Sequence, residues 1–181
     1  PLGQTELNVK LLETEHAIRQ GADEIDYVVN LTELKSGNWD LVRKEMDRIT
    51  RLCHQYGKIC KVIFETCYLS EEEIIRLAQI AREVKPDFIK TSTGKNGIAA
   101  TPEAAVAMCL AIRQFAEKTG RKVGFKAAGG ISTAESAALY YSIVEEILGE
   151  EWLTPERFRI GASSLANNLL SEIEGREIKY F

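Results

Sequence analysis

The chain has 181 residues, of which 45% are hydrophobic and 28% charged, and its formal net charge is −4 at pH 7. This composition is typical of a globular domain with a substantial apolar core. The acidic balance argues against nucleic acid or a membrane surface as the main partner, and no apolar run approaches the roughly 20 residues of a membrane-spanning helix.

The cysteines and histidines limit the chemistry that the chain can perform. No two cysteines form a C-x-x-C pair, so we expect small core residues in a reducing compartment and predict a cytoplasmic protein. A catalytic zinc commonly needs two or three converging histidines, and a nucleophilic triad needs one beside its nucleophile. Because the histidines are only His16 and His54, the sequence predicts neither a metal nor another cofactor. The cysteines are Cys53, Cys60, Cys67 and Cys109.

Short runs of strand-forming residues alternate with amphipathic helical segments along the chain. The chain opens at Pro1–Gly3 and continues into a helix with no strand ahead of it. The strands that follow are spaced by about 30 residues, which suits one strand, one helix and two loops per unit. The expected strands are Glu24–Asn30, Ile59–Glu65, Asp87–Thr91, Lys122–Lys126 and Arg157–Gly161.

The first helices between these strands carry start and stop signals. Asn38 is expected to cap one helix and Gly57 to end it. Ser70–Glu73 predicts a capping box for the next, in which the serine and glutamate side chains bond exposed backbone N–H groups, and Pro86 cannot continue that helix. The apolar stripe expected on the first of these helices is Val42, Met46, Ile49, Cys53 and Tyr56.

The later helices have similar signals. Thr101 is an expected N-cap with a proline in the first turn, and Gly120 is the expected stop. Ser132–Glu135 reads as a second capping box, and Gly149 is expected to end that helix.

Alternating strands and helices predict a parallel sheet, either open and doubly wound or closed into a (β/α)₈ TIM barrel. An open sheet covered on both faces has little room for polar strand residues, whereas a barrel interior opening at the strand C-termini does. The sequence therefore favours the barrel. The polar strand residues are Asp26, Lys61, Glu65, Lys90 and Lys126.

The sequence contains five of the eight strands that this fold needs. A (β/α)₈ barrel typically takes about 250 residues, and five strands cannot close it. We therefore expect residues 1–181 to be the C-terminal portion of a single barrel domain, cut just after a strand.

Two of the expected strands end in a lysine that is followed by a glycine-bearing turn. Lys90 leads into Thr91–Lys95, and Lys126 leads into Ala127–Gly130. Two ammonium groups held close in a poorly solvated place disfavour each other's charge, and a neutral amine attacks carbonyls. Taken singly, each lysine can mark a strand end and reach into water, but the repetition favours a nucleophilic pair.

Two glycine- or serine-rich segments before helices are predicted to hold an anion. Gly129–Gly130 precedes the helix that Ser132 is expected to cap, and Gly161–Ser164 follows the last strand. Glycines let the backbone approach an anion, and helix N-termini direct free N–H groups toward it. Each segment alone can be an ordinary cap, but barrel enzymes often bind phosphate after their last two strands. Lys95, after Gly94, can add a positive charge.

With these motifs the sequence resembles the deoxyribose-phosphate aldolases, which are class I (Schiff-base) aldolases with a (β/α)₈ fold. The resemblance covers essentially the whole chain apart from its last few residues. It implies a lyase of deoxynucleoside catabolism that reversibly cleaves 2-deoxy-D-ribose 5-phosphate to acetaldehyde and D-glyceraldehyde 3-phosphate. It also implies that the first three βα units of the family are missing. The matching segments are Gly21–Asp26, Lys61–Thr66, Phe88–Lys95, Gly124–Gly130 and Phe158–Ser164.

The resemblance also implies residue roles. Lys90 corresponds to the nucleophile that forms the Schiff base, Lys126 to the neighbouring cation that favours its neutral form, and Asp26 to the carboxylate that moves protons. The alternative for Asp26 is an ion pair that only neutralises lysines. Lys61 and Glu65 are expected to form a supporting pair. The positions that match the phosphate site are Gly94, Lys95, Gly129, Gly130, Ser163 and Ser164.

Two other interpretations stay open at this point. The chain can be a non-catalytic, incomplete barrel that pairs its open edges with another chain, or a different phosphosugar enzyme, such as an isomerase that uses no imine. Both the aldolase and the enzyme without an imine would take a phosphorylated sugar as substrate. We also expect the protein to be a homo-oligomer. Some family members use a C-terminal tyrosine, but the tail Lys179–Phe181 does not align clearly, and we expect Tyr180 to lie in a frayed terminus.

Overall fold

The computed structural model describes residues 1–96 and 99–180, which form an α/β fold around one parallel sheet. Each strand is hydrogen-bonded to the next along the chain, in the order β1-β2-β3-β4-β5. All five predicted strands are present, with bounds that differ by up to two residues. They are β1 (Glu24–Val28), β2 (Ile59–Ile63), β3 (Phe88–Lys90), β4 (Gly124–Ala128) and β5 (Phe158–Gly161).

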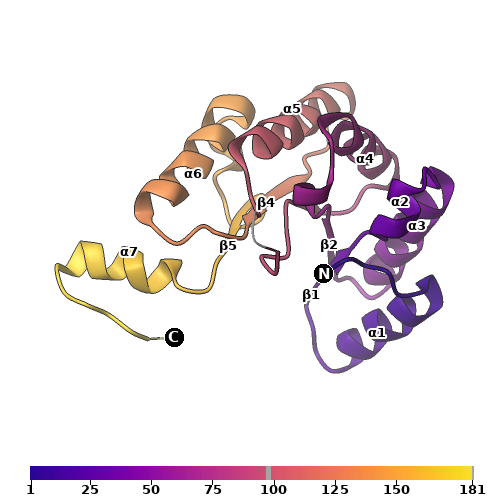
Figure 1. The fold of residues 1–181 in the computed structure, drawn as a ribbon, viewed down its shortest axis with the longest axis horizontal. Helices are drawn as coiled ribbons and strands as arrows, with labels where there is room; N and C mark the ends of the chain where they lie inside the picture. Colours follow the sequence, from indigo (N-terminus) through magenta and orange to yellow (C-terminus); the bar gives the residue numbers. More distant parts are fainter. Residues whose placement is uncertain (97–98, 181) are drawn as a thin grey trace.

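The helices α1 to α6 follow one another in an arc around the outside of the sheet, and α7 extends beyond its end (Figure 1). None of the helices in residues 1–96 and 99–180 is both long and apolar enough to cross a membrane. The α-helices and short 3₁₀ helices (η) are α1 (Leu7–Arg19), α2 (Leu31–Lys35), α3 (Trp39–Gln55), η1 (Thr66–Tyr68), α4 (Glu71–Val84), α5 (Pro102–Thr119), α6 (Ala134–Leu148), η2 (Glu150–Trp152) and α7 (Leu165–Glu174).

The strand order decides between the two architectures that the sequence leaves open. A doubly wound sheet reverses its strand order at a switch point and carries helices on both faces. Here the order follows the chain without reversal, and the helices lie along one side (Figure 1). The fold is therefore of the (β/α)₈ type, and the described residues form a partial barrel.

The helix ends follow most of the predicted signals. Ser70 and Glu73 form the expected capping box, and Thr101 and Gly120 cap α5. Two expectations are wrong. The cap of α6 is Thr133, which exchanges hydrogen bonds with Ser136, in place of Ser132 with Glu135, because the helix begins one residue later.

The second wrong expectation is the burial of Tyr56 at the end of α3, whereas the predicted position of the N-cap is confirmed. Asn38 is the N-cap residue of α3, but its side chain makes no capping hydrogen bond and donates instead to Glu33 at 2.5 Å. Four members of the predicted apolar stripe are buried, whereas Tyr56 is 43% exposed because it lies past the last helical residue.

The main core lies between the sheet and the helices, where alternate strand residues face outward from the barrel interior. The inward-facing side chains include Phe88, whose ring covers Gly124 on the neighbouring strand. A Cβ atom at position 124 would lie 2.4 Å from that ring, so only glycine fits there. The fully buried core residues include Met46, Val62, Leu77, Met108 and Phe125.

A buried ion pair fixes the end of β1. Lys10 on α1 donates to Glu45 on α3 at 2.8 Å and to the carbonyl of Val28 at 2.9 Å, and Glu45 accepts from the backbone N–H of Asn30 at 2.9 Å. Burial lowers the pKa of Lys10 and raises the pKa of Glu45, although each partner favours the charged form of the other. The pair connects α1 and α3 to the C-terminal end of β1, the strand that contains Asp26.

Candidate active site

Three lysines from three neighbouring strands converge on the carboxylate of Asp26. Its Oδ1 accepts from Lys61 Nζ at 2.8 Å, and its Oδ2 accepts from Lys90 Nζ at 2.9 Å and Lys126 Nζ at 2.7 Å. Two amines that bond the same oxygen lie side by side. The structure therefore brings Lys90 and Lys126 together, as their repeated motif predicts, while the roles assigned to them stay predictions.

The register of the parallel sheet produces this convergence. Asp26 is level with Lys61 on β2, and Lys90 is level with Lys126 on β4. Side chains two residues apart on a strand share a face, so all four residues point to the barrel interior. Lys90 is the last residue of β3, and the other three lie at the middle of their strands. The C-terminal end of the strands in a barrel is where loops gather to form active sites.

The cluster shifts the acidity of its own members. Burial opposes the ionisation of Asp26, but hydrogen bonds from Lys126, Lys61 and Lys90 together outweigh it, and the pKa of Asp26 lies well below its ordinary value. Burial lowers the pKa of Lys126, and the charges of Lys90 and Lys61 lower it further against the opposing pull of Asp26. The site therefore holds a permanent carboxylate beside an amine that loses its proton more readily than a free lysine.

Two charged residues that the sequence analysis did not assign extend the cluster into the barrel. Lys61 also pairs with Glu24 on β1 at 2.5 Å, and Glu24 accepts two hydrogen bonds from Arg159 on β5. The guanidinium of Arg159 lies 5.4 Å from the ring centre of Phe88. The alternation of side chains along β1 indicates that Glu24 shares a strand face with Asp26. The pairing of Glu24 with Arg159 could not be predicted, because it depends on the curvature of the barrel.

The expected pairing of Lys61 with Glu65 is wrong. Lys61 binds Asp26 and Glu24, while the Glu65 carboxylate accepts from the backbone N–H of Thr93 at 3.1 Å and from the Thr93 hydroxyl. The reason is geometric: β2 ends at Ile63, and Glu65 adopts a left-handed conformation that takes its side chain out of the strand's alternation.

The residues predicted to hold phosphate gather around one cleft of about 380 Å³. All six line it, from the loops that follow β3, β4 and β5. Lys90 lines the same cleft, so the side chain that touches Asp26 also reaches the predicted phosphate subsite. The other lining residues are Thr93, Ala128, Ile131, Ser132, Gly161 and Ala162.

Glycine is required at two turns of this cleft. Gly129 has φ +92°, and a Cβ atom there would lie 2.1 Å from the Ala99 Cβ. Gly94 has φ +76°, and its Cβ position is 3.3 Å from the Gly129 Cα. The two loops therefore touch backbone to backbone, an approach that residues larger than glycine would prevent.

The remaining candidates lie apart from the cleft. Tyr180 is 70% exposed and its backbone N–H donates to Asn167, while Phe181 lies outside the described residues. The cysteines are free thiols, of which Cys67 alone is not fully buried. Within residues 1–96 and 99–180 no group of three His, Cys, Asp or Glu side chains is arranged to hold a metal ion.

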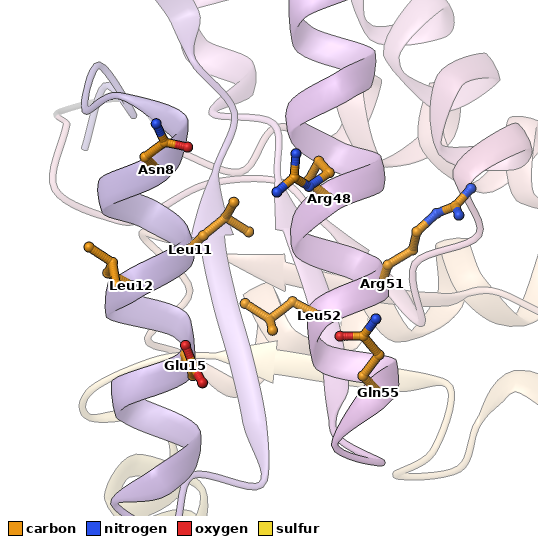
Figure 2. Close-up of a pocket in the computed structure, with 8 residues that line it drawn as sticks. All are labelled: Asn8, Leu11, Leu12, Glu15, Arg48, Arg51, Leu52 and Gln55. Atoms are coloured by element: carbon orange, nitrogen blue, oxygen red, sulfur yellow. The ribbon is translucent and has the colours of Figure 1, made fainter.

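A second cleft, of about 500 Å³, lies between α1 and α3 on the outside of the molecule. Figure 2 shows Leu11 of α1 and Leu52 of α3 directed toward each other across it. Its carboxylate, Glu15, is bound by Arg19 and Tyr56. This groove brings no nucleophile and acid together, so the converging chemistry identifies the smaller cleft at the strand ends as the candidate site.

Comparison with known proteins identifies the family of the chain. Residues 3–167 match the family described as DeoC/LacD family aldolase. The chain is 44% identical over 174 residues to a deoxyribose-phosphate aldolase of Mus musculus, covering 96% of this chain and 54% of the mouse protein. The chain thus spans about half the length of the relatives that it matches.

Solved structures give the same result. An aldolase called QR15 is 32% identical with a TM-score of 0.74, over 96% of this chain and 71% of that one. A deoxyribose-phosphate aldolase from Aeropyrum pernix, described as a unique tetramer, is 29% identical with a TM-score of 0.74, over 96% of this chain and 64% of that one. With its lysine cluster and glycine-lined cleft at the strand ends of a partial barrel, the chain belongs to the DeoC/LacD family of aldolases.

Proposed function

We propose that this chain carries the Schiff-base site of a 2-deoxy-D-ribose 5-phosphate aldolase, with Lys90 as the nucleophile. The observation that carries the proposal is the position of Lys90, whose amine bonds Asp26 beside Lys126 and whose side chain lines the glycine-rich cleft. Lys90 and Lys126 bond the same carboxylate oxygen, so their positive charges repel each other, and loss of one proton from the pair removes this repulsion. The resulting neutral amine can attack an aldehyde.

The proposed reaction begins at C1 of the open-chain sugar. The amine adds to this carbonyl, and the carbinolamine loses water to leave a protonated imine. Loss of the proton from the C3 hydroxyl then breaks the C2–C3 bond, because the imine accepts the electron pair as an enamine. D-Glyceraldehyde 3-phosphate leaves first. Protonation of the enamine at C2 and hydrolysis release acetaldehyde and restore the lysine.

Asp26 and Lys126 are proposed to assist the proton transfers. Asp26 stays ionised through the working range because its pKa lies well below the ordinary value, so its role is to accept hydrogen bonds from the carbinolamine and from a bound water that relays the proton. Lys126 has a lowered pKa and contacts the same oxygen, which makes it both a proton donor and the second candidate nucleophile. The substrate phosphate would lie against Gly94, Lys95, Gly129, Gly130, Ser163 and Ser164.

Borohydride trapping tests the nucleophile. The purified protein is incubated with acetaldehyde and sodium borohydride, digested and mapped by mass spectrometry. We expect one reduced two-carbon adduct at Lys90 and none in Lys90→Arg, because a guanidinium stays protonated and forms no imine. The matched control is Lys122→Arg, which changes a lysine near the start of β4 that pairs with Glu151 on the surface.

Each other result has a defined meaning. An adduct at Lys126 that survives in Lys90→Arg would exchange the two roles. Labelling of surface lysines alone, equal in both variants, would overturn the imine mechanism. Turnover of the phosphosugar by Lys90→Arg at the native rate would favour a barrel enzyme without an imine.

Three further expectations stay predictions: that residues 1–181 are the C-terminal portion of one barrel domain, that the protein is a homo-oligomer, and that it works in the cytoplasm. The tetramer of the related Aeropyrum pernix protein supports the second.

A further inference from the structure

Glu65 is a buried acid that the proposed reaction does not use. It is completely buried, follows the end of β2, and has φ 55° and ψ 60°, a conformation that residues other than glycine seldom adopt. Among the ion pairs of the described residues none includes Glu65. A buried carboxylate without a cation needs hydrogen-bond donors, so its partners show what it holds in place.

Among residues 1–96 and 99–180, both hydrogen-bond donors to the Glu65 carboxylate belong to Thr93. The Thr93 backbone N–H donates to Glu65 Oε1 at 3.1 Å, and the Thr93 hydroxyl donates to Oε2. The same hydroxyl oxygen accepts from the backbone N–H of Lys95 at 3.2 Å. A chain of hydrogen bonds therefore runs from the Glu65 carboxylate through Thr93 to the backbone of Lys95.

This series of hydrogen bonds ends at residues that line the cleft. Thr93, Gly94 and Lys95 all line the cleft, whereas Glu65 itself does not. The Gly94 turn in turn meets the Gly129 backbone, so a shift of Thr93 would move two of the three loops around the predicted phosphate subsite. Glu65 is thus placed to control the shape of that subsite without touching a ligand.

We infer that Glu65 is a positioning residue for the anion subsite: by holding Thr93, it fixes the Gly94–Lys95 turn in the position that binds the substrate phosphate. The inference rests on the proposed function only in taking the ligand to be a phosphorylated sugar. It also predicts the direction in which the affinity for phosphate changes when the Glu65 charge is removed. A buried negative charge near an anion should weaken binding, so a simple charge effect and a positioning effect change the affinity in opposite directions.

Glu65→Gln separates the two effects. The glutamine amide can accept from the Thr93 N–H, but its NH₂ group then faces the Thr93 oxygen and leaves the hydroxyl proton without its acceptor. We expect KM for 2-deoxyribose 5-phosphate to rise about five- to tenfold, with kcat and the kcat/KM for unphosphorylated 2-deoxyribose changed less than about twofold. Thr93→Val, which replaces the hydroxyl with a methyl group of similar size, should behave similarly, and the double variant should lose no more than the larger single loss.

A matched control is Thr50→Val, which removes a buried threonine hydroxyl on α3 that contacts Cys60. It should leave both KM values unchanged. Circular dichroism of each variant checks folding, and titration calorimetry with inorganic phosphate measures the subsite without turnover. A lower KM in Glu65→Gln, or equal losses for phosphorylated and unphosphorylated sugar, would overturn the inference.

The two proposals can fail separately. If the native protein binds inorganic phosphate and Glu65→Gln binds it more weakly, the positioning role holds even when borohydride traps nothing at Lys90. If trapping succeeds and both proteins bind phosphate equally, the aldolase proposal holds and the positioning role is wrong.

Discussion

Arg159 on β5 donates hydrogen bonds from Nη1 and Nη2 to the two carboxylate oxygens of Glu24 on β1, at 3.0 and 2.9 Å. These residues come from the first and last strands of the sheet, which are separated by three strands in the hydrogen-bonded order. A side-chain bridge between them is possible only because the sheet curves. The two-point geometry of the guanidinium therefore braces the curvature on which the lysine cluster depends.

Removing this bridge should loosen the sheet. We expect Arg159→Met to lower the free energy of unfolding by about 1–2 kcal/mol. Arg159→Lys should lower it by less, because the lysine ammonium keeps one of the two hydrogen bonds to Glu24. Both side chains are partly exposed, so solvent screening keeps the loss small. Urea denaturation measures it. Arg113→Met on α5, where the partner Glu117 lies at 4.0 Å on the surface, is the control and should change stability by less than about 0.5 kcal/mol.

Asp26 should make stability depend on pH in a defined direction. Its pKa in the folded protein is below the unfolded value, so its contribution is fully present above the unfolded pKa, near pH 4, and is lost as the pH falls toward the folded pKa. Asp26→Asn should therefore be less stable than the native protein at pH 7, and the difference should shrink below about pH 4. Urea titrations across this range provide the measurement, and a constant difference would contradict the assignment.

Breaking the buried Lys10–Glu45 pair should be costly. Glu45→Leu leaves the Lys10 ammonium buried without its partner and the Asn30 N–H without an acceptor, and we expect a loss of about 3–5 kcal/mol. The double variant Lys10→Met/Glu45→Leu should be more stable than this single variant, because no unpaired charge remains. Chemical denaturation of all three proteins tests the order. Equal or greater instability of the double variant would refute it.

The two adjacent glycines of the cleft should respond differently to alanine. Gly130 has φ +78° with nothing within 4 Å of its Cβ position, so Gly130→Ala should cost only the backbone strain of about 1–2 kcal/mol. Gly129→Ala adds a collision with Ala99 and should cost about 1–3 kcal/mol more. Thermal unfolding of the two variants compares them, and similar stabilities would show that the loop can move aside freely.

The strands and the paired lysines could be predicted because their signals are local. A buried strand ending in lysine and glycine is visible within ten residues, and the loops after consecutive parallel strands must meet at one edge of the sheet. The cleft residues follow from the same rule. Here the sequence and the structure agree, from Gly94 to Ser164.

What could not be predicted depends on the register and curvature of the sheet. The partners of Lys61 are residues of β1, and no spacing rule selects Glu24 and Asp26 over Glu65. Glu65 has a left-handed backbone conformation that changes the direction of its side chain after β2. No glycine in the sequence indicates this conformation. The single-turn helix α2, similarly, is too short to show a period.

The sharing of one aspartate by three lysines has a consequence for how this site can vary. Because each amine bonds the same carboxylate, replacing any one of them redistributes the other two, and the effects of separate replacements will not add. The effect of one lysine substitution therefore depends on which of the other lysines are present. The energy of a variant that changes two of these lysines therefore has to be measured as a double-mutant cycle, because it does not follow from the two single variants.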